Sequence, residues 1–335
     1  MVRSRVLSEV ASRTPVLTLE GLSIAAGNRE APLRLVEGVG LACERGTVSA
    51  LIGESGSGKS LTASALLGLL DSRIYDVSVE RLDVAGESLT SLDERDFARL
   101  RGTTVGYVMQ DHSTALDPTM TVGDQIAEIF VTHRGLDWKS AQREAVRLLD
   151  LVRIPSAASR ALDYPHSFSG GMRQRAVIAG AVALEPALLI ADEPTTALDV
   201  TVQAEILALI DDLRRSMGMS VLLITHDLGV VYQIADRVVV MYGGRVVEEG
   251  ETERLCRAPA HPYTAGLLAS VPDLEGRSGA VAAIPGAPPS LGAMMEGCAF
   301  RPRCSRALPA CGTSVPPIAP LRSGRLVRCL NPLSG

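Results

Sequence analysis

Residues 53–60, GESGSGKS, place glycines, a lysine and a serine in the G-x-x-x-x-G-K-[ST] order of a phosphate-binding loop. The glycines allow backbone N–H groups to wrap phosphate oxygens, Lys59 adds a positive charge at the β and γ positions, and Ser60 can ligate Mg²⁺. We expect nucleotide contacts from Gly53, Glu54, Ser55, Gly56, Ser57, Gly58, Lys59, Ser60 and Leu61. A chance glycine- and serine-rich turn is the alternative.

Two adjacent carboxylates, Asp192 and Glu193, end an apolar run that begins at Leu188. Burying two neighbouring anions is unfavourable unless a cation or a proton-transfer task holds them there. If Asp192 ends a parallel strand beside the phosphate loop, it can hold Mg²⁺ through water. Glu193 is then free of the metal and can polarise an attacking water as a general base. An ordinary strand end followed by a solvated turn is the alternative.

Four of the six cysteines fall near the C-terminus with the spacing C-x5-C-x6-C-x17-C: Cys298, Cys304, Cys311 and Cys329. In a reducing compartment such a group indicates a metal more than disulfides. Zinc sites favour closer cysteine pairs, whereas four thiolates on a loop-rich segment suit a [4Fe–4S] cluster. Zinc and unmetallated thiols remain alternatives.

Other residues around these cysteines also have expected roles. Nearby Arg301, Arg303 and Arg328 are expected to offset the thiolate charge. Cys43 and Cys256 lie outside the group and are expected to be buried as small hydrophobic residues.

The elements that must position these residues are visible in the hydrophobic pattern. Residues 47–52 and 188–191 are apolar runs typical of buried strands, and residues 61–70 have the pattern of a helix. Residues 137–152 place apolar side chains on one helical face, with Asp137 as the expected cap. Gly243 and Gly244 separate two apolar runs and predict a hairpin.

Composition limits the class of protein. The chain has 335 residues, of which 46% are hydrophobic and 21% charged, values typical of a globular protein with an aliphatic core. A net charge of −5 argues against general nucleic-acid binding. The first fifteen residues lack the apolar segment of a secretory signal, and no apolar run has membrane-spanning length. We therefore expect a cytoplasmic protein that reaches a membrane only through partners.

Residues 168–175, FSGGMRQR, open a further apolar helix that we expect to run to about Leu184. Ser169, Gly170 and Gly171 would offer a hydroxyl, bare N–H groups and a helix dipole to a phosphate. This segment resembles the signature motif of ABC-type ATPases. A serine cap with a glycine-rich first turn is the alternative.

Further motifs resemble the same family, in the family's order, and the resemblance covers roughly residues 16–330. It implies that Gln110 is the Q-loop glutamine, reaching Mg²⁺ and the attacking water, and that Asp199 belongs to the D-loop. His226 matches the switch histidine that contacts the γ-phosphate. The implied catalytic residues are Glu193, His226 and Gln110. The implied Mg²⁺ ligands are Ser60, Gln110 and Asp192.

The resemblance implies an α/β P-loop NTPase of ABC type, with a RecA-like core, an antiparallel β subdomain and an α-helical signature subdomain. In this family two cassettes pair head to tail, and each ATP lies between the phosphate loop of one and the signature of the other. Ser169, Gly170, Gly171 and Asp199 would therefore face the ATP of a second ATPase subunit. The family habit implies that this second subunit is a related chain, giving a heterodimer.

The C-terminal tail, residues 256–335, resembles one branch of this family in particular. HPYT at 261–264, IPGAPP at 284–289 and GCAFRPRC at 297–304 resemble the C-terminal extension of oligopeptide and dipeptide importer ATPases, with nickel and glutathione importers as near relatives. This implies a subunit that hydrolyses ATP to energise peptide import, held on the cytoplasmic face of the plasma membrane by two transmembrane permease subunits and served by an extracytoplasmic binding protein. Alternatives are nickel or glutathione cargo, a soluble ABC ATPase, or a redox-responsive regulator.

The expected organisation has a flexible N-terminus at 1–15, a cassette at 16–255 with its helical part at about 111–180, and the cysteine-containing extension at 256–335. One feature departs from the family, whose members usually stack an aromatic residue on adenine after the first strand. This chain has Ala25 and Ala26 there, and no aromatic residue precedes Tyr75. Losing this stacking should weaken nucleotide affinity or relax base selection, and we expect GTP to compete better than in relatives that have the aromatic residue.

Overall fold

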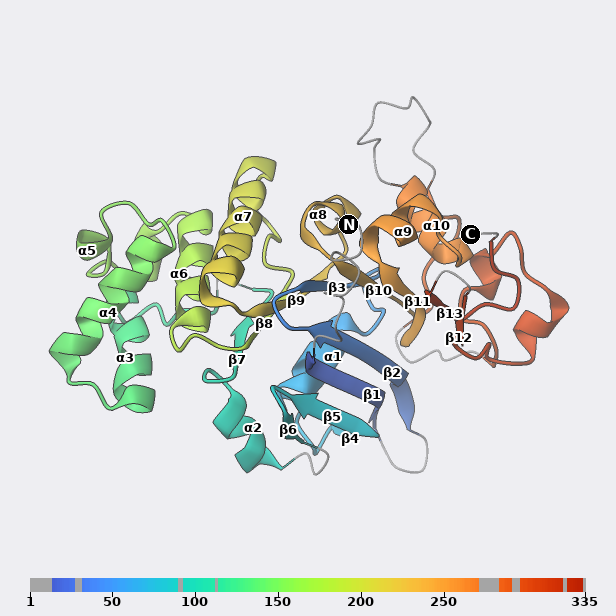
Figure 1. Cartoon of the computed structure of the whole chain (residues 1–335), viewed down its shortest axis with the longest axis horizontal. Coiled ribbons are helices and arrows are strands. Elements are labelled where there is room, and N and C mark those ends of the chain that lie inside the picture. Colours follow the sequence, from blue (N-terminus) through green and yellow to red (C-terminus); the bar gives the residue numbers. More distant parts are fainter. Residues whose placement is uncertain are drawn as a thin grey trace, which may run out of the picture.

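A parallel sheet lies at the centre of the molecule (Figure 1). The structure is a computed structural model, and it describes residues 14–27, 32–89, 93–111, 114–270, 283–290, 296–321 and 324–333. Five strands run parallel in the order β10-β3-β9-β8-β7. They are β3 (Val48–Ile52), β7 (Val105–Val108), β8 (Leu188–Asp192), β9 (Ser220–Thr225) and β10 (Arg237–Tyr242). Their side chains are almost all buried, as in a sheet covered on both faces.

Antiparallel strands extend the sheet beyond β10. The predicted hairpin is confirmed: Gly243 and Gly244 join β10 to β11 (Arg245–Glu251), and both glycines have the positive φ that this turn requires. Two short strands, β13 (Leu326–Val327) and β12 (Ala319–Pro320), complete that edge. The C-terminal part of the chain is thus hydrogen-bonded to the same sheet as the phosphate loop.

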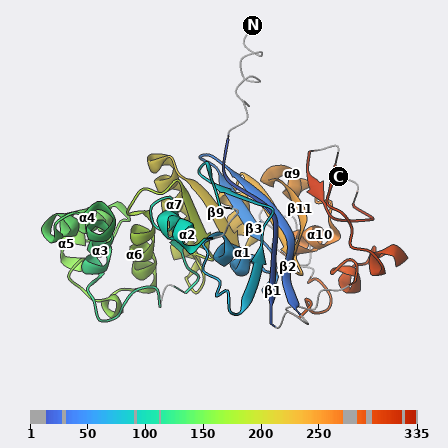
Figure 2. The same cartoon turned by 90° about the horizontal axis from the view of Figure 1, so that it is seen from below.

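A second, antiparallel sheet packs over helix α1 (Lys59–Leu66) (Figures 1 and 2). Its strands are β1 (Pro15–Ala26), β2 (Leu33–Glu44), β4 (Tyr75–Ser78), β5 (Arg81–Val84) and β6 (Glu87–Ser88). A shared core joins the two sheets, in which Val36 and Leu41 of the second sheet pack with Leu66 of α1 and with Ile190 and Ile224 of the parallel strands. The helix that follows the phosphate loop is therefore fixed from both sides.

Helices at one end of the molecule form a separate group. They are α3 (Val122–Arg134), α4 (Trp138–Leu151), α5 (Ala157–Arg160) and α6 (Gly170–Val182), with the short α2 (Glu94–Leu100) and the 3-10 turn η1 (Pro165–Ser167) nearby in the chain. The predicted cap is confirmed, since Asp137 Oδ1 accepts a hydrogen bond from Ser140 N at 3.0 Å. The predicted buried face of α4 is also confirmed.

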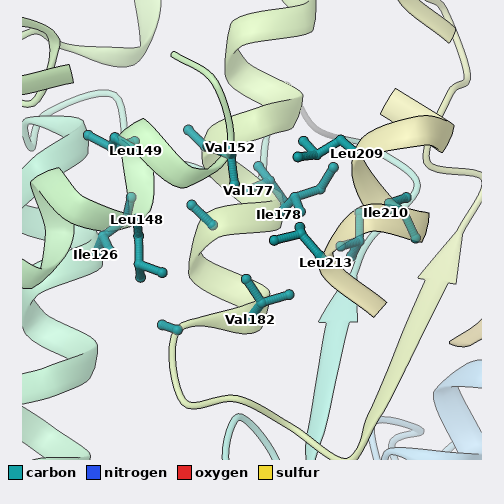
Figure 3. Close-up of a cluster of buried hydrophobic side chains, with 14 of the residues drawn as sticks. Ile126, Leu148, Leu149, Val152, Val177, Ile178, Val182, Leu209, Ile210 and Leu213 are labelled. Atoms are coloured by element: carbon teal, nitrogen blue, oxygen red, sulfur yellow. The ribbon is translucent and has the colours of Figure 1, made fainter. Parts of the chain in front are cut away.

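Helix α6 joins this group to the sheet through α7 (Val200–Met217). Side chains of α3 and α4 pack on one side of α6, and side chains of α7 pack on the other (Figure 3). The residues labelled there are Ile126, Leu148, Leu149, Val152, Val177, Ile178, Val182, Leu209, Ile210 and Leu213. Helix α6 ends at Val182 rather than at about Leu184.

The C-terminal part of the chain lies at the opposite end of the molecule from α3–α6 (Figures 1 and 2). Its elements are α9 (Thr252–Arg257), α10 (Pro262–Ala269), η2 (Arg301–Arg303) and η3 (Pro309–Gly312), and α8 (Leu228–Ile234) packs beside α9. The rings of Tyr242, Tyr263 and Phe300 meet with centroids 4.4 to 5.4 Å apart. Within the described ranges, every helix is too short or too polar to span a bilayer.

Candidate functional site

The phosphate loop lies between β3 and α1, and its glycines are required by close contacts. A Cβ atom at Gly53 would lie 2.3 Å from the carbonyl oxygen of Met241, and one at Gly58 would lie 2.9 Å from Cγ2 of Val36. Both glycines also have positive φ. Lys59 Nζ donates hydrogen bonds to the carbonyl oxygens of Gly53 (2.7 Å) and Glu54 (3.1 Å), so the loop closes on its own lysine.

Asp192 ends β8 directly beside the loop. Ser60 Oγ donates a hydrogen bond to Asp192 Oδ1 at 3.3 Å, and Asp192 is 2% exposed. Burial raises the pKa of Asp192, and the nearby Glu193 raises it further, against the lowering effects of the Ser60 hydrogen bond and the Lys59 charge. A hydroxyl and a buried carboxylate side by side are hard oxygen donors, and they fit Mg²⁺.

Glu193 gathers hydrogen bonds from three different segments. Its Oε2 accepts from Gln110 Nε2 at 3.2 Å and from Thr196 Oγ1 at 2.8 Å, and its Oε1 lies 3.1 Å from His226 Nδ1. Burial acts to raise the pKa of Glu193. The hydrogen bonds from Thr196 and His226, with the charges of His226 and Lys59, outweigh burial, and the pKa is lowered. The carboxylate is therefore kept ionised and oriented, as a base must be.

The backbone at Glu193 is strained. Its φ of +46° lies in the left-handed region, which is uncommon for a residue with a side chain. The N–H of Glu193 donates to the carbonyl oxygen of Ile224 at 2.8 Å, which anchors this bend to β9. Such strain tends to occur where function fixes a geometry.

The parallel topology explains why these residues meet. Gln110 follows β7, Asp192 and Glu193 follow β8, His226 follows β9, and the phosphate loop follows β3. Carboxyl ends of parallel strands share one edge of the sheet, where ligands bind in open α/β folds. The structure therefore brings together the residues that the sequence motifs singled out. Thr196, which donates to Glu193, is the one residue named here that the sequence motifs did not single out. The two threonines that follow Pro194 could have indicated it.

The signature residues lie at another place, where α6 and α7 begin. Ser169 Oγ accepts a hydrogen bond from Met172 N at 3.3 Å, and Asp199 Oδ1 accepts one from Val202 N at 3.0 Å. A Cβ atom at Gly171 would lie 2.7 Å from Cγ1 of Val202, so the two helix starts touch. Helices α6 and α1 occupy different parts of the molecule (Figure 1). The side chains of Ser169 and Asp199 act as the N-caps of α6 and α7. For Ser169, this is the role named above as the alternative.

Arg303 contacts the phosphate loop, a contact that sequence reasoning missed. We expected its charge to offset cysteine thiolates, but its guanidinium instead donates to both carboxylate oxygens of Glu54, at 2.6 and 3.1 Å. Arg328 donates to the carbonyl oxygens of Val246 and Pro316, and its expected role beside the cysteines stays a prediction. A further contact comes from Tyr263, whose hydroxyl oxygen accepts a hydrogen bond from Glu54 N at 2.9 Å.

The four C-terminal cysteines line one small enclosed cavity, together with His261 and Phe300. Burial raises the pKa of Cys298 and of Cys329, with the neighbouring cysteines adding to the effect. However, the described residues include no group of three or more histidine, cysteine, aspartate or glutamate side chains arranged to hold a metal ion. The structure therefore does not confirm an iron–sulfur cluster.

The remaining two cysteines differ from each other. Cys43 is fully buried in β2, as predicted. Cys256 is partly exposed in α9, so the prediction of burial was wrong for that residue.

Comparisons with known proteins agree with this geometry. The family described as ABC transporter matches residues 36–196, and the family described as Oligopeptide/dipeptide transporter, C-terminal region, matches residues 247–311. The oligopeptide transport ATP-binding protein AppD of Bacillus subtilis is 44% identical over 317 residues, which cover 94% of this chain and 96% of AppD. The chain belongs to the oligopeptide/dipeptide branch of the ABC transporter ATP-binding proteins.

Other relatives of this ABC ATPase agree. The oligopeptide transport ATP-binding protein OppD of Salmonella typhimurium is 42% identical over 334 residues, 98% of either chain. Among solved structures, cbiO1 from Clostridium perfringens, part of the transporter complex cbiONQ, has a TM-score of 0.62 at 26% identity and covers 72% of this chain and 90% of its own. The cassette MJ0796 has a TM-score of 0.62 at 24% identity, covering 70% of this chain and 98% of its own, which supports the fold alone. The predicted ABC ATPase cassette fold is confirmed.

Proposed function

We propose that this ABC ATPase hydrolyses ATP to ADP and phosphate and that this reaction energises import of dipeptides or oligopeptides. The observation that carries the proposal is Glu193, held by Gln110 and His226 at the sheet edge that also bears the phosphate loop. The peptide assignment rests on the C-terminal region matched at 247–311 and on relatives named as oligopeptide transport ATP-binding proteins.

The residues of the loop would bind the triphosphate of ATP. Backbone N–H groups of residues 53–61 would surround the phosphates, and Lys59 would move its ammonium from the loop carbonyls to phosphate oxygens. When bound, Mg²⁺ neutralises phosphate charge, and Ser60, Asp192 and Gln110 are the residues that would hold it.

Glu193 would accept the proton of the attacking water. Its lowered pKa keeps the carboxylate ionised, and the hydrogen bonds from Gln110, Thr196 and His226 fix the direction in which it points. His226 Nδ1 must carry a hydrogen in this pair, because an ionised carboxylate only accepts. Nε2 of the same ring is then available toward the γ-phosphate.

A second cassette would complete each site. The starts of α6 and α7 lie together and away from α1 of their own chain (Figure 1). They carry Ser169, Gly170, Gly171 and Asp199. This position suits contact with the ATP bound by a partner. We propose a heterodimer with a related ATPase chain. Its partners would be two transmembrane permeases and, indirectly, an extracytoplasmic binding protein, with the pair held peripherally on the cytoplasmic face of the membrane.

We further propose a division into a cassette at 16–255, with its helical part at about 111–180, and an extension at 256–335. Residues 1–13 of the expected N-terminal segment lie outside the described residues. The extension would hold a [4Fe–4S] cluster through Cys298, Cys304, Cys311 and Cys329. The support is that four soft thiol donors line one enclosed cavity.

The cluster proposal has its own test. Anaerobically purified protein should contain about four iron and four acid-labile sulfide per chain, and Cys329→Ser should lose both, whereas Cys256→Ser should retain them. Zinc in place of iron, or metal-free thiols, would overturn the cluster without affecting the ATPase assignment.

The transport function is tested in vesicles that contain the complete complex. ATP inside the vesicle, on the cassette side, should drive accumulation of a labelled di- or oligopeptide, and Glu193→Gln in this chain should abolish it. Uptake of nickel or glutathione with no peptide uptake would reassign the cargo. ATP hydrolysis without any permease dependence would favour a soluble ATPase.

A further inference from the structure

Three motifs of the C-terminal tail converge on a single residue of the phosphate loop. Tyr263 comes from the HPYT segment, Ile284 and Pro285 come from the IPG segment, and Arg303 comes from the FRPRC segment. Tyr263 and Arg303 form hydrogen bonds with Glu54, the second residue of the loop. The carbonyl oxygens of Ile284 and Pro285 accept hydrogen bonds from Arg303. The sequence separation between Arg303 and Glu54 is 249 residues.

The contact between Arg303 and Glu54 is bidentate and secluded. Arg303 Nη1 and Nη2 donate to Glu54 Oε2 and Oε1 at 2.6 and 3.1 Å, and the Arg303 side chain is 5% exposed. Paired hydrogen bonds between a guanidinium and a carboxylate fix direction as well as distance. An ammonium group cannot reproduce this geometry, so lysine is a poor substitute here.

The rest of the Arg303 side chain is held by its own part of the protein. Nε donates to the carbonyl oxygen of Pro285 at 2.9 Å, and Nη2 lies 3.4 Å from that of Ile284. Nη1 also donates to the hydroxyl oxygen of Tyr242 at 3.2 Å, and the guanidinium carbon lies 5.8 Å from the centre of that ring. These contacts fix the position of the guanidinium independently of Glu54.

The backbone of Glu54 is held as well. Its N–H donates to the buried hydroxyl of Tyr263, and its carbonyl oxygen accepts from Lys59 Nζ at 3.1 Å. The side chain, the N–H and the carbonyl of one loop residue thus all have assigned partners. Displacing Glu54 would change the position of Lys59 and of the neighbouring N–H groups that surround phosphate.

We propose that Arg303 and Tyr263 are positioning residues for ATP binding, and that the tail fixes the phosphate loop through Glu54. Neither residue needs to touch the nucleotide. The C-terminal part of the chain would then fix the position of Glu54, and through it the conformation of the phosphate loop of the same chain.

The test compares KM and kcat for ATP in the assembled complex. Arg303→Lys keeps the positive charge but loses the paired hydrogen bonds to Glu54. It should raise KM about fivefold, with kcat changed less than about twofold. Tyr263→Phe removes one oxygen atom and should raise KM about threefold. Arg306→Met, which alters an exposed arginine of the same tail, is the matched control and should leave both parameters unchanged.

Two further measurements separate positioning from a general loss of stability. Amide hydrogen exchange should accelerate in residues 53–58 of Tyr263→Phe, with no change in α3 and α4. The effects of Arg303→Lys and Glu54→Gln on KM should also be non-additive, since both disrupt one pair. If Arg303→Lys and Tyr263→Phe lower the melting temperature while KM and exchange in the loop stay at wild-type values, the proposal is overturned.

Discussion

Oε1 of Glu193 lies 3.1 Å from Nδ1 of His226, across the ends of two adjacent parallel strands. The same carboxylate accepts from Gln110 and Thr196 through its other oxygen. A side chain with this many donors around it stays ionised and keeps one orientation. The arrangement makes a specific prediction for its removal.

Glu193→Gln preserves shape but cannot accept a proton. We expect ATP turnover in the complex to fall at least about 100-fold, with ATP binding retained. The measurement is phosphate release together with equilibrium binding of labelled ATP. Glu185→Gln, an exposed acid before β8, is the control and should behave as wild type. Unchanged turnover in Glu193→Gln would remove the basis of the proposed mechanism.

Asp192→Asn should act through the metal requirement. The substitution removes the carboxylate that faces Ser60, so the Mg²⁺ concentration for half-maximal turnover should rise about tenfold or more. A magnesium titration of ATPase activity checks this. Asp212→Asn alters an exposed carboxylate of α7 and should leave the titration unchanged. A fall in maximal rate at unaltered Mg²⁺ dependence would contradict the assignment of Asp192.

Cys43 should resist alkylation in the folded protein. Burial raises its pKa to about 12, so the reactive thiolate is scarce at pH 8, and the side chain is also shielded from reagent. We expect iodoacetamide to label the partly exposed Cys256 while Cys43 stays unmodified, as read by peptide mass spectrometry. Unfolding in urea should expose Cys43, and rapid labelling of Cys43 without urea would contradict the burial.

The same pKa shift predicts how stability depends on pH. The folded pKa of Cys43 lies above the unfolded value of 9.0, so raising the pH deprotonates the unfolded chain first. The contribution of Cys43 to stability is therefore complete below pH 9 and is lost as the pH rises toward 12. Cys43→Ala should flatten this loss in urea titrations compared at pH 8 and pH 10.

Base selection by this cassette should be weak. The structure pairs Ala26 with Tyr75 across β1 and β4, and Tyr75 is packed partly into the core. We expect GTP to compete with ATP, and Ala26→Tyr to tighten ATP binding by about fivefold, because stacking on a base is worth about 1–3 kcal/mol. Ala26→Leu adds bulk without a ring and is the control. Failure of GTP to compete in a displacement assay would count against this expectation.

The meeting of these residues at one edge of the sheet was predictable because each part of the arrangement is local in sequence. A loop of eight residues, an acid pair after an apolar run and a histidine after another run each carry their own pattern, and parallel strand pairing then brings them together. The cap of α4 and the hairpin at Gly243 were predictable for the same reason.

Contacts between distant segments were not predictable in this way. Arg303 and Glu54 are 249 residues apart and Tyr263 and Glu54 are 209 apart, and no periodicity in either segment refers to the other. Charge alone pointed Arg303 toward the cysteines, because the loop carboxylate is remote in sequence. The exposure of Cys256 depends on how α9 packs, which its own sequence does not define.

The left-handed backbone of Glu193 has a consequence for mutational drift. Glycine and asparagine adopt this φ with less strain than glutamate, so the backbone alone favours replacement of the acid. Replacement would also remove the hydrogen bonds from Gln110, Thr196 and His226, which join three segments at the sheet edge. A laboratory search for heat-tolerant descendants of this chain would therefore have to rebuild these contacts elsewhere before it could discard the carboxylate.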